Sequence, residues 1–262
     1  MKAFWCMLLA MAISTSAASS ARATLHTESV KYTVGDTQCI GYLAYDDSAK
    51  NAPGVLVAPE WWGLTDYTKH RAEQLAGLGS VAFVMDPYGN GQTTDDPRVA
   101  GKLSGALRGN DRTVLRQRAA AALDILKKDP HVNPAKLAAI GYCFGGTTVL
   151  ELARSGADVL GVVSFHGGLS TPNPADAKNI KGKVLICHGA DDTFESPEEI
   201  AAFKKEMNDA GVDWQMNIYS HAVHAFTNPE ADSHHIPGIA YNAAADRRSW
   251  EAMKAFFDEI FK

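Results

Sequence analysis

Short apolar runs alternate with helical patterns along most of the chain, and this alternation constrains the fold more than any other feature of the sequence. Five runs have the length and apolar character of strands that are buried on both faces of a sheet. They are residues 55–58, 81–84, 137–140, 159–165 and 184–186. A further run, residues 214–219, is less apolar and is expected toward an edge. Strands that alternate with helices form a mostly parallel central sheet with helices on both faces, so we expect an α/β fold.

The segments between these strands carry helix signals of two kinds. Apolar residues recur at helical spacing within residues 111–128 and again within residues 250–260. Ser196 and Glu199 have the spacing of a capping box, and Pro197 suits the first position of a helix. These signals predict three of the helices that cover the sheet.

Other stretches depart from the alternation. Residues 28–34 and 37–45 have strand composition and are joined at Gly35-Asp36, which predicts an N-terminal β-hairpin. Residues 87–109 are rich in Gly and Asp, and residues 228–238 carry two adjacent histidines. We expect both of these stretches to be long loops. Long loops in a compact domain are often functional, so each is a candidate wall of a site.

The first 23 residues are expected to be a cleavable signal peptide. Lys2 precedes an apolar stretch at residues 3–13, and Ala21-Arg22-Ala23 matches a cleavage site. A membrane anchor is the alternative, but the apolar stretch is short for a bilayer span. We therefore expect a periplasmic or secreted protein. Its mature part, residues 24–262, is expected to be a single domain because no repeat or linker divides it.

Composition and charge limit the kind of partner. The 262 residues are 46% hydrophobic and 21% charged, which excludes a disordered or fibrous chain. The formal net charge is −5, without a basic patch that would attract nucleic acid or an anionic membrane. We expect a monomer that acts on a small molecule, and that contacts neither nucleic acid nor, once the signal is removed, a membrane.

The sequence Gly141-Tyr142-Cys143-Phe144-Gly145-Gly146 stands between a predicted strand and a predicted helix. This is the setting of a nucleophile elbow, in which a sharp turn holds a nucleophile in a strained conformation between residues without side chains. The N-terminus of the following helix favours a thiolate at Cys143, and the N–H of Phe144 is suited to an oxyanion hole. The alternative is a buried structural cysteine in a glycine-rich turn.

Partners for such a nucleophile follow in the expected order. Asp191 and Asp192 come directly after the strand at residues 184–186, where sites of open α/β sheets form. His221 and His224 follow the strand at residues 214–219. Either aspartate could instead cap the next helix, and the histidines could be a solvated loop pair or a metal pair without a clear third ligand. An acid and then a histidine after the nucleophile favours a catalytic triad.

Cysteine usage supports a functional thiol. Cys39, Cys143 and Cys187 remain once the signal is removed, which is an odd number in a compartment that oxidises thiols. At least one of them is therefore free or paired between molecules. We expect Cys39 and Cys187 to be structural.

Several of these motifs together resemble the dienelactone hydrolase family, whose members have the α/β-hydrolase fold. The resemblance runs from about residue 55 to the C-terminus. Its motifs are Ala58-Pro59-Glu60-Trp61-Trp62-Gly63, Asp86-Pro87-Tyr88, Gly141 to Gly146, His188-Gly189-Ala190-Asp191-Asp192 and His224-Ala225-Phe226. The cysteine within the Gly-x-Cys-x-Gly-Gly element is fairly specific, since most proteins of the fold carry serine there.

The resemblance implies roles for individual residues. It implies a triad with Cys143 as nucleophile, His224 as base and Asp192 as the acid that orients the imidazole. Trp61 is implied to supply a second oxyanion N–H beside that of Phe144. Glu60 is implied to contact the nucleophile, where a carboxylate would keep the thiol protonated until substrate arrives. The resemblance implies no cofactor and no metal.

One departure concerns the substrate. Family members that act on dienelactone bind its carboxylate through arginines, one of them a few residues after the histidine, where this chain reads Phe226-Thr227-Asn228-Pro229. Compensating side chains would come from the expected loop and its neighbourhood. The candidate substrate-binding residues are Tyr88, Arg98, Arg108 and Arg112. We therefore expect weaker preference for substrates that carry a carboxylate.

The expected function is hydrolysis of a small carboxylic ester or dienelactone-like lactone through a cysteine acyl-enzyme. One alternative is a thioesterase or peptidase-like acyl transfer enzyme with the same triad. The other is a non-catalytic periplasmic thiol or binding protein, because a fold alone does not establish a function.

Overall fold

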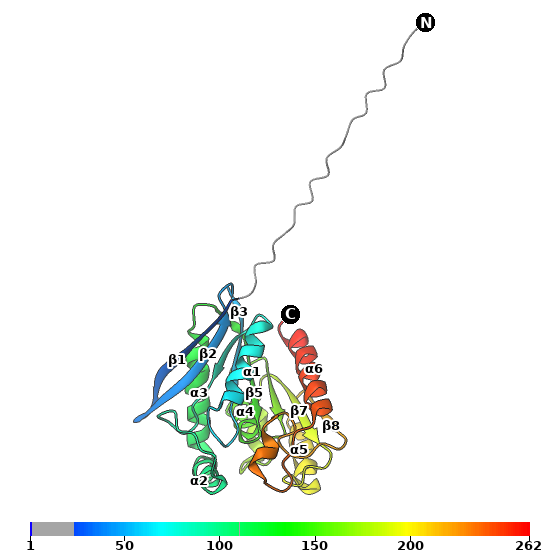
Figure 1. Ribbon diagram of the computed structural model, residues 1–262. Coiled ribbons are helices and arrows are strands. Elements are labelled where there is room, and N and C mark those ends of the chain that lie inside the picture. The colour runs from blue at the N-terminus through cyan, green and yellow to red at the C-terminus, as the bar shows by residue number, and fades with distance from the viewer. Residues whose placement is uncertain (2–23, 110) are drawn as a thin grey trace.

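The computed structural model of the chain describes Met1 and residues 24–109 and 111–262. Apart from Met1, the expected signal segment lies outside the described residues. Eight strands of the described part form one sheet in the order β1-β2-β4-β3-β5-β6-β7-β8 (Figure 1). They are β1 (Leu25–Val34), β2 (Thr37–Asp46), β3 (Ala52–Ala58), β4 (Val81–Val84), β5 (Val132–Tyr142), β6 (Gly161–Phe165), β7 (Lys183–Gly189) and β8 (Trp214–Tyr219). The pairings from β4 to β8 are parallel, which confirms the expected α/β architecture.

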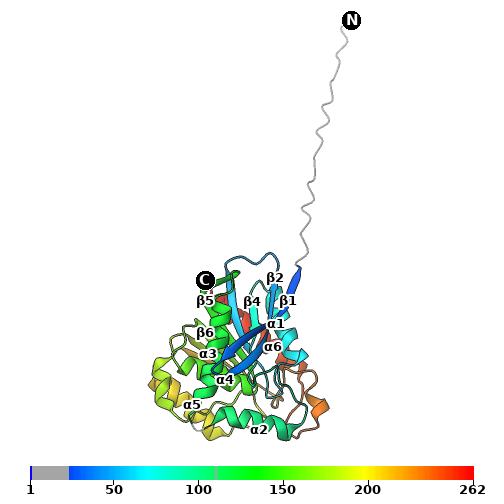
Figure 2. The same cartoon turned by 90° about the vertical axis from the view of Figure 1, so that its left-hand side faces the viewer.

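Helices cover both faces of the sheet. The helices are α1 (Asp66–Gly77), α2 (Pro97–Arg108), α3 (Thr113–Lys127), α4 (Phe144–Arg154), α5 (Pro197–Asp209) and α6 (Ala243–Ile260). Buried side chains of α1 and α6 pack in one core cluster with the sheet, while those of α3, α4 and α5 pack in another. Helix α2 lies across the end of the molecule away from the C-terminus (Figure 2).

Most of the expected elements are present with modest shifts at their ends. The hairpin is β1 and β2, which pair in antiparallel register from Val34↔Thr37 onward. Its turn needs a glycine because Gly35 has a φ of 57°. β8 is an edge strand, as its weaker apolar character predicted. The capping box of Ser196 and Glu199 is formed at the start of α5.

The prediction of one long loop at residues 87–109 is wrong, because α2 occupies its second half. The side chain of Asp96 accepts a hydrogen bond from the N–H of Arg98, and Pro97 occupies the first helical turn. Ala100 and Leu107 are buried on its inner side. Two glycines within the helix, Gly101 and Gly105, obscured this pattern, since glycine is a poor helix former. Residues 228–238 are largely irregular, with a short 3₁₀ helix at Ala231–His234.

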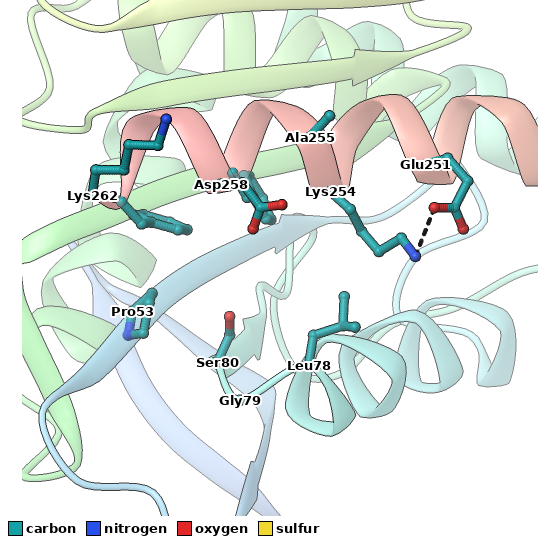
Figure 3. Close-up of a pocket in the computed structure, with 11 residues that line it drawn as sticks. Pro53, Leu78, Gly79, Ser80, Glu251, Lys254, Ala255, Asp258 and Lys262 are labelled. Atoms are coloured by element: carbon teal, nitrogen blue, oxygen red, sulfur yellow. Dashed lines mark ion pairs between the residues drawn. The ribbon is translucent and has the colours of Figure 1, made fainter.

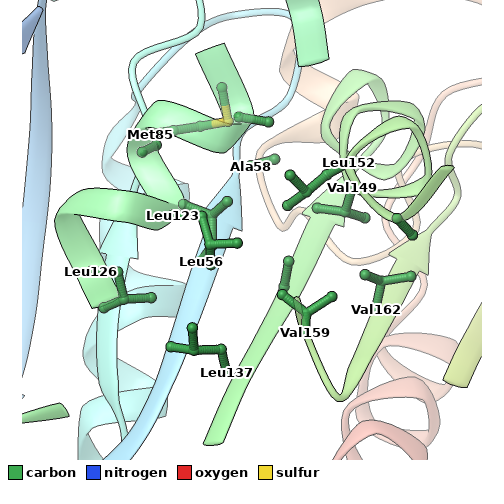
Figure 4. Close-up of a cluster of buried hydrophobic side chains, with 14 of the residues drawn as sticks. Leu56, Ala58, Met85, Leu123, Leu126, Leu137, Val149, Leu152, Val159 and Val162 are labelled. Carbon is green, nitrogen blue, oxygen red and sulfur yellow. The ribbon is translucent and has the colours of Figure 1, made fainter. Parts of the chain in front are cut away.

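The core beside the site is built of aliphatic side chains from the sheet and from α3 and α4 (Figure 4). The cluster includes Leu56 of β3 with Leu123 and Leu126 of α3, and Val149 of α4 with Val162 of β6 (Figure 4). Replacing a buried leucine such as Leu56 by alanine would cost about 2–5 kcal/mol. This packing fixes β5 and α4, between which the nucleophile candidate stands.

Candidate active site

Cys143 occupies a tight turn between β5 and α4. Its backbone has φ 52° and ψ −116°, a conformation that side chains rarely tolerate. The turn can form only because its neighbours are glycines: a Cβ on Gly145 would lie 2.0 Å from the carbonyl oxygen of Ala58, and one on Gly141 1.9 Å from that of Gly145. The Cys143 side chain is half-buried at the N-terminus of α4. The geometry is that of the expected elbow.

His224 and Asp192 lie together beside this turn. The Nδ1 atom of His224 is 2.9 Å from Oδ2 of Asp192, and the carboxylate is fully buried. The other oxygen of Asp192 accepts a hydrogen bond from the N–H of Phe194 at 2.9 Å. Asp191 and His221, the alternative candidates, are exposed. The structure therefore pairs the aspartate and the histidine that the resemblance implied.

Opposing effects act on the protonation of His224. Burial favours the neutral imidazole, but the negative charge that Cys143 carries when it is a thiolate, together with hydrogen bonds to Asp192 and Cys143, outweighs the effect of burial. The pKa of His224 is therefore raised well above its usual value. A histidine in this position is suited to hold a proton taken from the thiol.

A second histidine, His166, was not expected from the sequence. It follows β6, is fully buried, and its Nδ1 accepts a hydrogen bond from the N–H of Cys143 at 3.1 Å. Its Nε2 lies 2.7 Å from the hydroxyl of Thr227, which is 2.6 Å from the hydroxyl of Tyr67. Burial, with the nearby charge of His224, holds the pKa of His166 well below its usual range. This series of buried hydrogen bonds holds the backbone of Cys143 in place.

A cavity of about 140 Å³ opens onto the Cys143 sulfur. It is lined by Trp61, Arg108, Cys143, Phe144, Thr147, Gly168, Phe194, Glu195, His224 and Ile239. Five of these residues were expected at the site from the sequence: Trp61, Arg108, Cys143, Phe144 and His224. Glu195 is the other titratable side chain of the wall, and no motif in the sequence distinguishes it.

The remaining substrate-binding candidates lie at different distances from this cavity. Tyr88 packs with Phe144 and Cys143, and its hydroxyl donates a hydrogen bond to the carbonyl oxygen of Trp61 at 2.7 Å. Arg98 is 90% exposed and pairs with Asp96 at the start of α2. Arg112 precedes α3 and is half-buried. The structure thus brings Tyr88 and Arg108 to the site, and leaves Arg98 and Arg112 outside its lining.

Glu60 is buried in the loop after β3. Its carboxylate accepts a hydrogen bond of 2.8 Å from the side-chain amide of Asn228. Burial raises the pKa of Glu60 to about 7, although Asn228, His224 and Arg71 act in the opposite direction. Asn228, which stands where an arginine was expected, is itself buried and holds Glu60 instead of facing the cavity.

The two backbone N–H groups expected for an oxyanion hole have no hydrogen-bond acceptor within the described residues. Phe144 begins α4, and helix-initiating N–H groups have no partner within the helix. Neither Phe144 nor Trp61 donates its backbone N–H to an acceptor in the described part of the chain. Both residues line the cavity.

The other two cysteines differ from Cys143 in exposure. Cys39 and Cys187 are fully buried, and the three described cysteines are free thiols. Burial raises the pKa of Cys187 to about 12, which suppresses its thiolate. Cys143 is therefore the accessible thiol of the described residues.

A larger hollow of about 540 Å³ lies elsewhere, between the C-terminal parts of α1 and α6 (Figure 3). Pro53 and Ser80, which line it, precede or begin strands β3 and β4, so it is at the amino ends of the parallel strands. Its charged residues include the exposed ion pair of Lys254 with Glu251. Ligands of open α/β sheets bind at the carboxyl ends of the strands, where Cys143 lies.

The residues that the structure describes also bear on other kinds of site. No group of three or more His, Cys, Asp or Glu side chains is arranged to hold a metal ion there. No helix in the same part of the chain is both long and apolar enough to cross a membrane.

Comparisons with known proteins show which family the chain resembles and which solved structures share its fold. The model of the dienelactone hydrolase family matches residues 40–261. "Protein usf" of Aquifex pyrophilus is 31% identical over 222 residues, covering 84% of this chain and 92% of that protein. The solved structure of m3DLH is 45% identical with a TM-score of 0.88, and covers 91% of this chain and 99% of its own. A dienelactone hydrolase-like promiscuous phosphotriesterase from metagenomic libraries is 46% identical with a TM-score of 0.85, covering 90% and 98%.

Proposed function

The chain belongs to the dienelactone hydrolase family and is a hydrolase of that class acting on a small molecule, and from this premise we propose that it cleaves a small carboxylic ester or lactone through a thioester on Cys143. The observation that carries the proposal is the convergence of three features on one cavity. These are a half-buried thiol in a strained elbow, the buried pair of His224 with Asp192, and the two free backbone N–H groups.

The reaction begins with attack of the Cys143 sulfur on the carbonyl carbon of the substrate. His224 holds the proton of the thiol, and Asp192 fixes the ring so that Nε2 faces the sulfur. The N–H groups of Phe144 and Trp61 stabilise the oxyanion of the tetrahedral intermediate. His224 then protonates the leaving alcohol, and a water molecule activated by the same imidazole hydrolyses the thioester.

Glu60 has a role between turnovers in this proposal. A carboxyl with a pKa of about 7, close to His224, disfavours negative charge at the site at neutral pH. The thiol then stays protonated until substrate displaces the carboxyl. Because the thiolate is the form that oxidises, this restraint would protect Cys143 in an oxidising compartment.

The test is hydrolysis by the purified protein before and after alkylation of its thiols. A panel of small esters, lactones, thioesters and peptides separates the ester hydrolase from the thioesterase or peptidase alternatives. We expect turnover of neutral esters and lactones, loss of that turnover on alkylation, and almost none in Cys143→Ala. A phosphotriester belongs in the panel because of the 46% identical promiscuous phosphotriesterase.

Cys187→Ala is the matched control for this test. It removes another free thiol that is buried and outside the cavity. This variant should keep its turnover, with stability lower by about 1–3 kcal/mol from lost packing. Full activity of Cys143→Ala would overturn the proposal, and no turnover of any panel member by the wild type would favour a non-catalytic thiol or binding protein.

We also propose that the protein is exported and loses residues 1–23 on the way. The charged Lys2, the apolar stretch and the Ala-x-Ala site support this proposal. N-terminal sequencing of protein recovered from the periplasm or medium should begin at Thr24. Recovery of the uncleaved chain in the cytoplasm would contradict it.

A further inference from the structure

Glu195 forms part of the wall of the catalytic cavity, where neither the triad nor the oxyanion hole requires a carboxyl. It shares the cavity with Cys143 and His224 and lies just before the first residues of α5. The carboxyl is half-buried. A charge in a partly enclosed position is screened less than one in open solvent, so it can act on a bound substrate.

The hydrogen bonds of Glu195 leave one oxygen for a ligand. Oε2 accepts the N–H of Leu169 at 3.1 Å, which ties the residue to the loop after β6. Oε1 lies beside Gly168, where a Cβ would be 3.2 Å away, and Gly168 also lines the cavity. No cation forms an ion pair with Glu195 among the residues that the structure describes. Its negative charge is therefore not cancelled by a salt bridge.

The charged groups around Glu195 come from three segments of the chain. Glu199 of α5 and Asp192 of the loop after β7 are like charges, and His224 from the loop after β8 is the opposite one. Burial, together with these carboxylates, raises the pKa of Glu195 to about 7, while the N–H of Leu169 and His224 act against this rise. Thr147 of α4 is uncharged. The cavity wall thus changes its charge near neutral pH.

Besides His224, which is paired with Asp192, Arg108 of α2 is the cationic side chain on the same cavity. It is exposed, and its guanidinium lies 5.8 Å from the centre of the Phe144 ring. Solvent screens this charge more than that of the half-buried Glu195. A substrate that enters the cavity therefore meets a stronger negative field from Glu195 than positive field from Arg108.

We propose that Glu195 is a specificity-determining residue that favours substrates with a cationic or hydrogen-bond-donating group beside the scissile ester and disfavours those with a carboxylate there. This inference rests on the proposed esterase function and names its substrate class. Ionised Glu195 accepts a hydrogen bond from an ammonium or hydroxyl of the substrate and repels an anion. Protonated Glu195 discriminates less, so the preference increases as the pH rises through 7.

The test uses two rigid sets of aryl esters that differ only in one para substituent. In the acyl set, phenyl esters of benzoic acid carry a methyl, an aminomethyl or a carboxyl group. In the alcohol set, acetates of phenol carry the same three groups. The measured quantity is kcat/KM for the cationic member divided by kcat/KM for the anionic member. Comparing this ratio between variants cancels the intrinsic reactivity of each ester.

Glu195→Gln removes the charge and keeps an oxygen that can accept the N–H of Leu169. We expect the ratio at pH 8 to fall about tenfold or more in at least one set, as loss of a nearby charge implies. The fall should be smaller at pH 6, where the wild-type carboxyl is protonated. Glu199→Gln is the matched control, because it removes a neighbouring carboxylate, in the first turn of α5 and outside the cavity, and should change the ratio less than about twofold.

Three results would overturn the inference. The first is an unchanged ratio in both ester sets for Glu195→Gln. The second is an equal change of the ratio in Glu199→Gln, which would indicate that the ratio responds to any carboxylate near the cavity. The third needs no variant: a wild-type ratio that stays constant between pH 6 and 8. Failure of the proposed function gives a different result, because the wild type would then hydrolyse no member of either set. The proposed role of Glu195 would then be contradicted as well.

Discussion

Two buried histidines in contact, His224 and His166, show opposite behaviour within one site. Their ring centroids are 5.3 Å apart. The pKa of His224 is raised well above the usual value and that of His166 is held well below it. Burial lowers the pKa of both, so burial cannot explain the difference. The negative charge of a Cys143 thiolate and the hydrogen-bond partners of each ring decide which histidine can carry a proton.

Each partner set requires a different protonation state. Nδ1 of His224 donates to the Asp192 carboxylate, an arrangement that favours an imidazolium. Nδ1 of His166 must instead be an acceptor, because its partner is the backbone N–H of Cys143. Protonation of His166 would remove that acceptor. In the proposed mechanism His224 is therefore the histidine that moves protons, and His166 is a positioning residue that keeps Cys143 in place.

The comparison is tested most strongly by removing the imidazole of His224. We expect His224→Ala to lower kcat/KM for a small ester roughly a hundredfold or more, the loss typical of a missing general base. His221→Ala is the control, since this histidine is exposed three positions earlier on the same loop. A large loss in His221→Ala with near-normal activity of His224→Ala would exchange the two assignments.

Removing His166 should have a smaller effect on turnover and a clearer one on stability. His166→Ala leaves the buried N–H of Cys143 with one acceptor fewer, and we expect unfolding free energy lower by about 1–3 kcal/mol. Turnover should fall about tenfold. His166→Asn offers an oxygen close to the position of Nδ1 and tolerates the positive φ of 42° at this residue, so it should restore part of both losses.

The pH dependence of this stability loss distinguishes positioning from simple packing. Below about pH 6.5 the unfolded His166 takes up a proton that the folded residue does not, because its folded pKa is depressed. The contribution of His166 is therefore present above pH 6.5 and lost as the pH falls. The difference in unfolding free energy between wild type and His166→Ala should narrow by about 1.4 kcal/mol per pH unit in that range. A difference independent of pH would contradict a neutral acceptor.

The smallest expected effect concerns Glu60. The charge of His224 is one of the influences that lower the pKa of this carboxyl. Glu60→Gln should accelerate iodoacetamide labelling of Cys143 a fewfold near neutral pH, as well as its inactivation by peroxide. The rate is followed by mass spectrometry of the labelled peptide across pH. Identical profiles in wild type and variant would leave Glu60 without a role in guarding the thiol.

The catalytic candidates could be read from the sequence because their signals are local. The glycines around Cys143 and the acid and histidine after successive strands each mark the end of a strand. Helix α2 was missed because Gly101 and Gly105 weaken its periodic pattern.

His166 and Glu195 were missed for another reason, since each acts through contacts across the fold. The pairing of Tyr142 with Phe165 in β5 and β6 places His166 next to Cys143, and only that register could have indicated it. Glu195 looked like an ordinary acid near a helix start. Its importance depends on its place in a cavity wall that is completed by helices α2 and α4 and by the loops after β3, β6 and β8.

The most direct test of the account is to identify the residue that carries the acyl group during turnover. Wild-type protein is mixed with an excess of a slowly hydrolysed ester, quenched in acid within the first turnovers, digested and examined by mass spectrometry. The account predicts an acyl mass on the peptide that contains Cys143 and no such mass in Cys143→Ala. In His224→Ala the adduct should form more slowly and, because its hydrolysis is also impaired, persist longer than in the wild type. An acyl group on any other side chain, or undiminished turnover without an adduct at Cys143, would contradict it.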